Sequence, residues 1–254
     1  MISFNQINKT YNKKNKALID LTFDLKPGIT GFIGLNGAGK STTINILSGL
    51  ISVDTGEVKI LGNPIKAGDW KYKSEVGFVL EKASYLENLT GKEYLTFAGI
   101  MYNMDKKLTD NRVKELMEYF ELPYDDNKQI KEYSKGMKKK ISLSCALLNN
   151  PKLLVLDEPL EGLDPISINR AKKLLLQLKS TDVTIFISSH ELGTIEEICD
   201  DIIIINKGLK VFQGNFDELI EFSGLSVEEA KSISLEELFV KLVGDNSEKK
   251  LSWV

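Results

Sequence analysis

Three apolar runs in the second half of the chain predict buried strands. Leucine, isoleucine, valine and phenylalanine fill most of residues 153–156, 183–188 and 202–205, and helical spacings of apolar residues lie between these runs. Continuous, β-branched runs of this length are typical of strands that are buried on both faces of a parallel sheet. The pattern therefore predicts an α/β fold with a parallel sheet at its core.

The first third of the chain is richer in predicted strands. Apolar residues alternate with mostly polar ones over residues 17–25, which predicts a half-buried strand before the turn at Pro27 and Gly28. Further apolar runs predict strands at residues 29–33, 58–61 and 76–80, and a helical spacing predicts a helix over residues 43–50.

Residues 90–150 predict a helical lobe. Thr90 and Glu93 have the spacing of a capping box, and apolar residues recur at i, i+3, i+4 and i+7 from Val113 to Phe120. Two more capping boxes, at residues 226–229 and 234–237, predict short helices in the acidic tail.

The composition is that of an ordinary globular protein. The 254 residues are 42% hydrophobic and 27% charged, and 33 lysines and arginines against 36 acids give a net charge of −3. The longest stretches without a charge, residues 27–39 and 41–53, are shorter than the roughly 20 apolar residues that span a bilayer. The N-terminus has neither a basic nor an apolar leader, so we expect a cytoplasmic chain without a transmembrane helix.

Residues 34–41 carry the clearest chemical motif, GxxxxGK[ST], between a predicted strand and a predicted helix. Glycines let backbone N–H groups curl toward phosphate oxygens, and the helix adds the positive end of its dipole. Lys40 would reach the β- and γ-phosphates, and the Ser41 hydroxyl would bind Mg²⁺. The residues expected to contact the nucleotide here are Asn36, Gly37, Ala38, Gly39, Lys40, Ser41 and Thr42.

A pair of acids ends the strand at residues 153–156. Ligands lie at the carboxyl ends of strands in open α/β sheets, so Asp157 and Glu158 are expected at the phosphate site. Asp157 would hold Mg²⁺, and Glu158 would orient and deprotonate the attacking water. The alternative is a solvated acidic strand end, which the phosphate loop makes the weaker interpretation.

His190 follows the strand at residues 183–188 and is the single histidine of the sequence. A lone histidine is usually a bystander, but this strand end points to a hydrogen bond to charge that develops on the γ-phosphate. A metal site is not expected at this histidine, because neither Cys145 nor Cys199 stands at ligand spacing from a second ligand.

Together these motifs resemble the nucleotide-binding subunits of ATP-binding cassette (ABC) transporters over nearly the whole chain. The family signature LSGGQ has its counterpart in residues 133–137, where Ser134 and Gly136 match and the other three residues depart. The signature binds the γ-phosphate of the ATP on the other subunit, which again uses a helix N-terminus and a serine hydroxyl. The lysines at 138–140 that follow could also contact a ligand, although a solvated face is the more ordinary interpretation.

The resemblance assigns roles to three further residues. Tyr11 matches the aromatic residue that stacks on adenine, although a tyrosine at a strand end is often simply packed. Asp164 lies in the loop that couples the two sites of a dimer. Glu81 stands where the family commonly has a glutamine that contacts Mg²⁺, so its role stays open between a metal contact and an ordinary exposed acid.

The resemblance also implies the architecture. We expect a P-loop NTPase core with a parallel sheet, an N-terminal antiparallel β edge and a helical subdomain. The expected units are residues 1–87 (β edge and phosphate-loop core), 88–150 (helical subdomain with the signature), 151–213 (the remaining core) and 214–254 (a short helical tail).

The function implied is that of an ATPase that uses ATP and Mg²⁺. The expected partners are a second ATPase subunit, most simply a second copy, and a separately encoded integral membrane permease, so the chain would lie on the inner face of the cell membrane. Export is the expected direction. A soluble ABC ATPase that acts on ribosomes or nucleic acid is the alternative, which the charge of −3 disfavours, and a module that binds ATP without turnover is a third.

Overall fold

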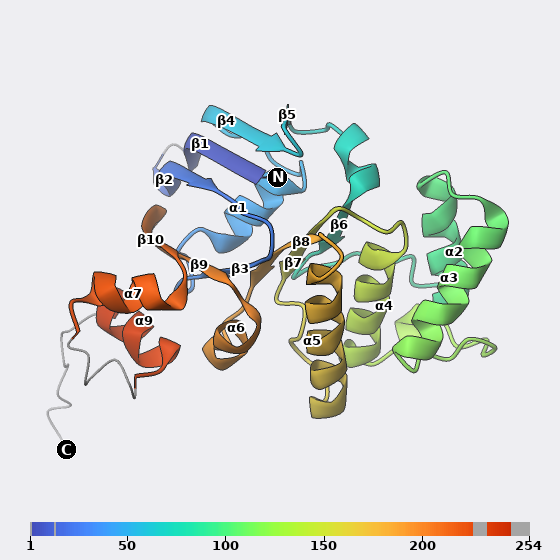
Figure 1. Cartoon of the computed structure of the whole chain (residues 1–254). Coiled ribbons are helices and arrows are strands. Elements are labelled where there is room, and N and C mark those ends of the chain that lie inside the picture. Colours follow the sequence, from blue (N-terminus) through green and yellow to red (C-terminus); the bar gives the residue numbers. More distant parts are fainter. Residues whose placement is uncertain (1, 13, 226–232, 245–254) are drawn as a thin grey trace, which may run out of the picture.

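Two β-sheets and the helices around them make up the described part of the chain (Figure 1). The computed structural model describes residues 2–12, 14–225 and 233–244. The six-stranded sheet has the order β10-β9-β3-β8-β7-β6, and the four-stranded sheet has the order β2-β1-β4-β5. The predicted α/β fold with a parallel sheet and an antiparallel β edge is confirmed.

The larger sheet holds the strands predicted from continuous apolar runs. Its strands β3, β6, β7, β8 and β9 run parallel, and β10 pairs antiparallel with β9 at the edge. Parallel neighbours end at the same edge of the sheet, so residues that follow these strands are brought together. The bounds are β3 Ile29–Ile33, β6 Val76–Val79, β7 Leu153–Asp157, β8 Thr184–Ser188, β9 Asp201–Asn206 and β10 Leu209–Gly214.

Both faces of this sheet are covered, which explains the lack of polar alternation. In β7, Leu154 and Leu156 pack into the core on one face, and Leu153 and Val155 pack into the core on the other. Helices of the second half of the chain cover the first face, and α1 with the antiparallel sheet covers the second (Figure 1). The helices concerned are α1 (Lys40–Leu47), α4 (Lys135–Leu147), α5 (Pro165–Lys179) and α6 (Leu192–Ile198).

Aromatic packing joins the two sheets. The rings of Phe32 and Phe186 on the parallel sheet lie 6.1 and 6.0 Å from Phe23, which stacks on Phe4 at 4.5 Å. All four rings are almost completely buried. The strands of the antiparallel sheet are β1 (Ile2–Tyr11), β2 (Asn15–Asp24), β4 (Thr55–Ile60) and β5 (Asn63–Pro64).

Two local predictions for the N-terminal third were inaccurate. Asp20 has φ +45°, and this irregularity in β2 places both Leu18 and Leu21 in the core, where strict alternation would place Leu18 outside. The helix predicted over residues 43–50 is α1, which begins three residues earlier and ends before Gly49 at φ +68°.

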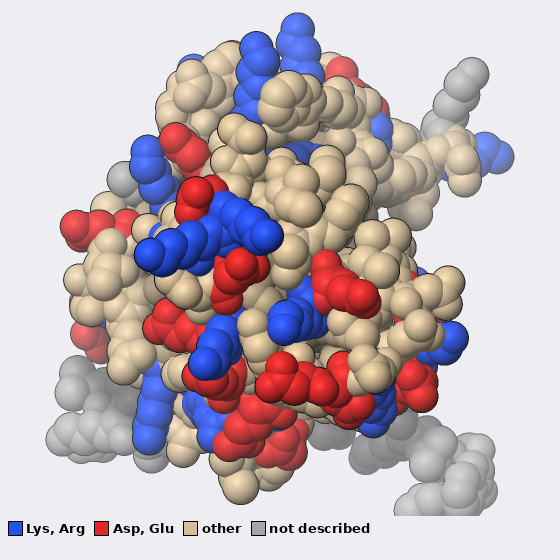
Figure 2. All heavy atoms as spheres, turned by 90° about the vertical axis from the view of Figure 1, so that its right-hand side faces the viewer, with Lys and Arg blue, Asp and Glu red and all other residues tan. Residues whose placement is uncertain are grey.

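The helical lobe packs beside the parallel sheet, at the right in Figure 1. Its helices are α2 (Gly91–Met101) and α3 (Lys106–Tyr119), followed by a short 3-10 helix at Ile130–Glu132. Another 3-10 helix, at Lys71–Glu75, lies outside the lobe and directly precedes β6. Thr90 and Glu93 form the predicted capping box. Figure 2 looks onto the side of the molecule where this lobe lies, and acidic and basic side chains alternate there around an uncharged area.

Two short helices, α7 (Phe216–Ser223) and α9 (Leu235–Val243), form the described part of the tail. Ser234 and Glu237 form the second predicted capping box, whereas the box predicted at residues 226–229 lies outside the described residues. Within the described ranges, no helix combines the length and the apolar character needed to cross a membrane.

Candidate functional site

The glycine-rich loop after β3 has the curled backbone that its sequence predicts. Gly37 and Gly39 have φ +80° and +115°, and a Cβ on Gly39 would lie 2.7 Å from the Ala17 carbonyl oxygen. Helix α1 starts directly after Gly39, and within the described residues no side chain caps its first amides. These N–H groups at the positive end of the helix are therefore suited to bind an anion.

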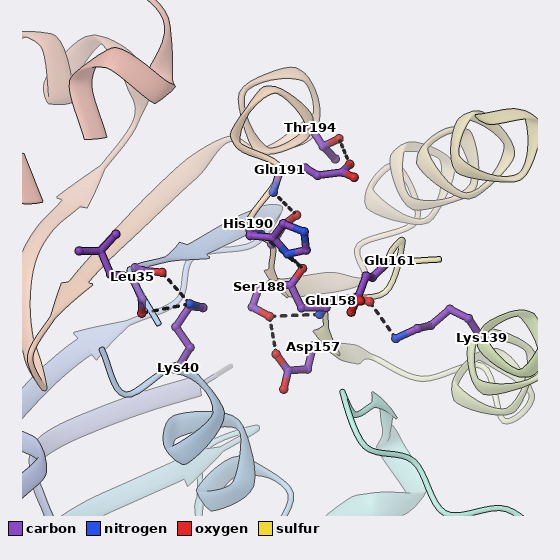
Figure 3. Close-up of polar contacts among 12 residues, drawn as sticks. Leu35, Lys40, Lys139, Asp157, Glu158, Glu161, Ser188, His190, Glu191 and Thr194 are labelled. Carbon is purple, nitrogen blue, oxygen red and sulfur yellow. Dashed lines mark hydrogen bonds and ion pairs between the residues drawn. The ribbon is translucent and has the colours of Figure 1, made fainter. Parts of the chain in front are cut away.

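The Lys40 side chain bends back over this loop (Figure 3). Its Nζ donates to the carbonyl oxygens of Gly34 at 2.6 Å and Leu35 at 3.4 Å. Burial lowers the pKa of Lys40, and the charges of Glu158, Asp157 and Glu81 oppose this effect. Lys40 and these three acids, which come from distant parts of the sequence, are thus close enough to interact.

A cavity of about 230 Å³ opens beside the loop. Tyr11, 36% exposed at the end of β1, contributes to its wall. The lining combines this ring with the polar loop, which suits a ligand with an aromatic and an anionic part. The remaining lining residues are Asn15, Ala17, Leu35, Asn36, Gly37, Gly39, Lys40, Ser41 and Thr42.

Asp157, the last residue of β7, has a buried carboxyl group that accepts a hydrogen bond from a serine hydroxyl. The register pairs Asp157 with Ser188 on β8, and Ser188 Oγ donates to Asp157 Oδ1 at 2.5 Å. Burial raises the pKa of Asp157, the Ser188 hydrogen bond opposes the rise, and the charge of Glu81 adds to it. Ser188 was missed as a site residue, although a polar residue that ends a buried strand is a signal for one.

Glu158 and His190 face each other across the ends of β7 and β8 (Figure 3). His190 Nδ1 lies 2.9 Å from Glu158 Oε2, and the main-chain N–H of His190 donates to the same oxygen at 3.3 Å. Glu158 has φ +47°, a conformation that costs energy in a residue with a side chain. Burial raises the pKa of Glu158, and His190 opposes the rise. A carboxylate of raised basicity is suited to accept a proton.

Ser134, Gly136 and Asp164 lie apart from the cavity of Tyr11 and the phosphate loop, since none of them lines it. Ser134 caps α4 by accepting a hydrogen bond from the Met137 N–H, and its side chain is exposed. Gly136 packs against Gly162, whose carbonyl oxygen would lie 2.9 Å from a Cβ on Gly136. Asp164 caps α5.

The interpretation of residues 138–140 as a solvated face is wrong for Lys139. Its side chain is buried, with 8% of the residue exposed, and Nζ donates to the Glu158 carbonyl oxygen at 2.8 Å. Spacing gives the reason, because Lys139 shares the buried side of α4 with Ser142, Leu143 and Ala146. That same spacing, visible in the sequence, could have identified it.

The acids of the site fit a magnesium ion better than a metal held by protein ligands alone. Over the residues that the structure describes, no cluster of three or more histidine, cysteine or acidic side chains could hold a metal. Mg²⁺ takes hard oxygen ligands, and in nucleotide sites it is bound by one or two carboxylates together with waters and phosphates. Asp157, the Ser41 hydroxyl and the nearby Glu81 are donors of this kind.

A phosphate loop beside an acidic strand end on a parallel sheet defines a P-loop nucleotide-binding protein. The family model described as ABC transporter matches residues 18–161. An ABC transporter ATP-binding protein of Nostoc sp. is 38% identical over 82% of this chain, and this chain spans 63% of that relative's length. The linearmycin resistance ATP-binding protein LnrL of Bacillus subtilis is 36% identical over 86% of this chain and 70% of its own length.

A solved structure agrees with these relatives. The ATP-binding subunit of an ABC transporter matches 95% of this chain and 99% of its own, with a TM-score of 0.87 and 31% identity. The chain therefore belongs to the ABC transporter family of ATP-binding proteins, as its motifs predicted.

Proposed function

We propose that the chain binds ATP between Tyr11 and the phosphate loop and hydrolyses it. Adenine would stack on Tyr11, and the phosphates would lie on the loop amides and Lys40. The observation that carries the proposal is the parallel pairing of β3, β8 and β7, which brings the phosphate loop with Lys40 to the same edge of the sheet as Asp157 and Glu158 (Figure 3). One bound nucleotide could then contact both Lys40, the cation for its phosphates, and Glu158, the base for the attacking water.

Hydrolysis transfers the γ-phosphoryl group to water. The water oxygen bonds to the γ-phosphorus, the bond to the β–γ bridging oxygen breaks, and ADP and phosphate leave. Glu158 takes the proton of the water, while Lys40 and His190 stabilise the charge on the phosphoryl oxygens. Burial of Glu158 supports this role, because it makes the carboxylate a better base.

Mg²⁺ would be held by Ser41 and Asp157, with Glu81 beside them. When bound, the ion would neutralise charge on the phosphates. Asp157 supports this assignment, because a buried carboxylate whose pKa is raised by burial gains from a cation. The hydrogen bond from Ser188 fixes which Asp157 oxygen is left for the metal.

A second copy would complete the site. Ser134 and Gly136 lie at the N-terminus of α4, and Asp164 at the N-terminus of α5, outside the cavity of their own chain. In a head-to-tail pair with two-fold symmetry these residues would face the γ-phosphate held by the other copy. ATP would then lie between the two chains and hold them together.

The proposed use of this cycle is to energise a separately encoded membrane permease, from the inner face of the cell membrane. The lobe at residues 88–150 and the segment of Glu81 would dock the permease. Export is the proposed direction, supported by the name of the linearmycin resistance relative. A cassette that acts on ribosomes or nucleic acid is the competing use.

Two measurements test the proposal. Purified protein with ATP and Mg²⁺ should release phosphate, and Glu158→Gln should form an ATP-dependent dimer in size-exclusion chromatography with light scattering. Lys40→Ala is the control that should neither dimerise nor turn over. No phosphate release by the wild type, together with no ATP-dependent dimer of Glu158→Gln, would contradict the proposed hydrolysis.

A pull-down tests the partner. Tagged Glu158→Gln protein, with ATP, is recovered from detergent-solubilised membranes and from cytosol of its own cell, and co-purified proteins are identified by mass spectrometry. An integral membrane permease enriched over the Lys40→Ala control supports the transport function. Ribosomes or DNA in its place would overturn that use and leave the ATPase assignment standing.

A further inference from the structure

Lys139 differs from the two lysines beside it. Lys138 pairs with Glu87 at 3.1 Å on the surface, and Lys140 lies 4.0 Å from Asp164. Lys139 points inward and gives its hydrogen bond to a main-chain oxygen, that of Glu158, at 2.8 Å. Burying an ammonium group is costly unless it is hydrogen-bonded, so this position demands a partner.

Lys139 binds the peptide group that follows Glu158, through its carbonyl oxygen. The peptide group that precedes Glu158 is also hydrogen-bonded, through its N–H. The Glu158 N–H donates to Ser188, to the carbonyl oxygen at 3.3 Å and to Oγ at 3.2 Å. Lys139 holds the Glu158 carbonyl oxygen. A residue with a side chain keeps a left-handed backbone, here φ +47°, where its surroundings over-determine it. Ser188 and Lys139 supply that constraint.

The backbone conformation of Glu158 decides where its carboxylate lies. Figure 3 shows the Glu158 side chain directed to His190, on the side of the strand end away from Lys139. A change of the Glu158 backbone would move Oε2 from its position 2.9 Å from His190 Nδ1. A hydrogen bond that restrains the Glu158 carbonyl oxygen would therefore also restrain the position of the carboxylate.

The same helix contacts this segment at two more points. Lys135 Nζ lies 2.6 Å from Glu161 Oε1, and Gly136 packs against Gly162. The first turns of α4, which carry Ser134 at their start, are thereby attached to residues 158–162. A shift of Ser134 on binding a phosphate would be transmitted to Glu158 through Lys139.

We propose that Lys139 is a positioning residue for hydrolysis, which holds the Glu158 carbonyl oxygen and so keeps the Glu158 carboxylate beside His190. Lys139 touches neither nucleotide nor water in this role. The inference rests on the proposed function, in which Glu158 is the base for water. It further links the signature helix of one chain to the base of that same chain.

The test compares three variants with the wild type in steady-state phosphate release and in equilibrium binding of a fluorescent ATP analogue without Mg²⁺. Lys139→Met keeps the apolar stem and removes the donor, Lys139→Gln restores an uncharged donor, and Lys138→Met is the matched control. Misplacing a catalytic group by about 1 Å can cost about 10²-fold in rate. We therefore expect Lys139→Met to lower kcat at least about tenfold, with nucleotide affinity within about twofold of the wild type.

Lys139→Gln should recover part of kcat, and Lys138→Met should match the wild type. A kcat for Lys139→Met within about twofold of the wild type would overturn the inference, and so would a loss shared equally by kcat and affinity. If Lys139→Met folds poorly in thermal unfolding, Lys139→Leu, which also removes the donor, decides: its kcat should fall while its affinity stays, and an unchanged kcat overturns the inference. A wild type without turnover would instead overturn the proposed function.

Discussion

His190 Nδ1 lies 2.9 Å from Oε2 of Glu158, and the two side chains differ sharply in exposure. The imidazole is 62% exposed and the carboxylate 13%. Because a carboxylate oxygen accepts hydrogen bonds, His190 Nδ1 is the donor to Glu158. The other ring nitrogen, Nε2, is then on the side of the ring away from the carboxylate. Each group orients the other, so a change in either one is expected to affect hydrolysis before it affects binding.

Glu158→Gln is expected to lower the rate of ATP hydrolysis by about 10²-fold or more, because the amide cannot accept the proton of the water. ATP affinity should stay near that of the wild type, since Lys40 and the loop amides are unchanged. Phosphate release and calorimetric ATP binding measure the two effects. The matched control is Glu197→Gln, whose acid pairs with Lys172 on the surface. Equal turnover in Glu158→Gln and the wild type would exclude Glu158 as the base.

His190→Ala is expected to slow hydrolysis by about 10- to 10²-fold, through loss of a hydrogen bond to developing charge and of the orientation of Glu158. His190 does not line the cavity of Tyr11 and the phosphate loop, so ATP affinity should stay near that of the wild type. Single-turnover rates and ATP titrations separate the two effects. A loss of affinity at an unchanged rate would contradict the assignment.

Asp164 gives a pH dependence to the stability of the fold. Ser167 donates its Oγ and N–H to the carboxylate and lowers the pKa of Asp164 to about 2, below the value of about 3.9 in an unfolded chain. The carboxylate therefore stabilises the folded state above about pH 4, and this contribution is lost as the pH falls toward about 2. Asp164→Asn keeps an N-cap but does not titrate.

Urea unfolding of the wild type and Asp164→Asn at a series of pH values measures this contribution. The advantage of the wild type should be constant near neutral pH and should shrink below about pH 4. Parallel profiles of unfolding free energy down to about pH 3 would show that the hydrogen bonds do not perturb the carboxyl group.

Much of the site could be predicted because its residues follow unambiguous elements. The apolar runs of β7 and β8 predict strands in the middle of a parallel sheet. The residues that follow such strands, here Asp157 and His190, are then expected at the same edge of the sheet. The glycine spacing around Lys40 likewise predicts the phosphate loop before helix α1. Local patterns suffice where burial on both faces leaves one solution.

Features that depend on distant partners escaped prediction. The left-handed backbone of Glu158 is hydrogen-bonded to Ser188 and Lys139, which lie 30 and 19 residues away in the sequence. The irregularity at Asp20 depends on Asn8 of the neighbouring strand, whose side chain accepts from the Asp20 N–H and donates to its carboxylate. Tertiary contacts decide such positions, and no local periodicity records them.

Gly77 in β6 tests how closely α4 packs on the sheet. A Cβ at this position would overlap the Ala146 carbonyl oxygen, which is backbone, and would lie 2.7 Å from Leu154 Cδ2 in the core. Gly77→Ala should therefore lower the free energy of unfolding by at least about 2 kcal/mol. Gly193 in α6 is the matched control, because among the described atoms none lies within 4 Å of its added Cβ. Gly193→Ala should change stability by less than about 1 kcal/mol, in the stabilising direction. Urea unfolding followed by circular dichroism measures both, and equal midpoints for the two variants would refute the close packing of α4 on β6.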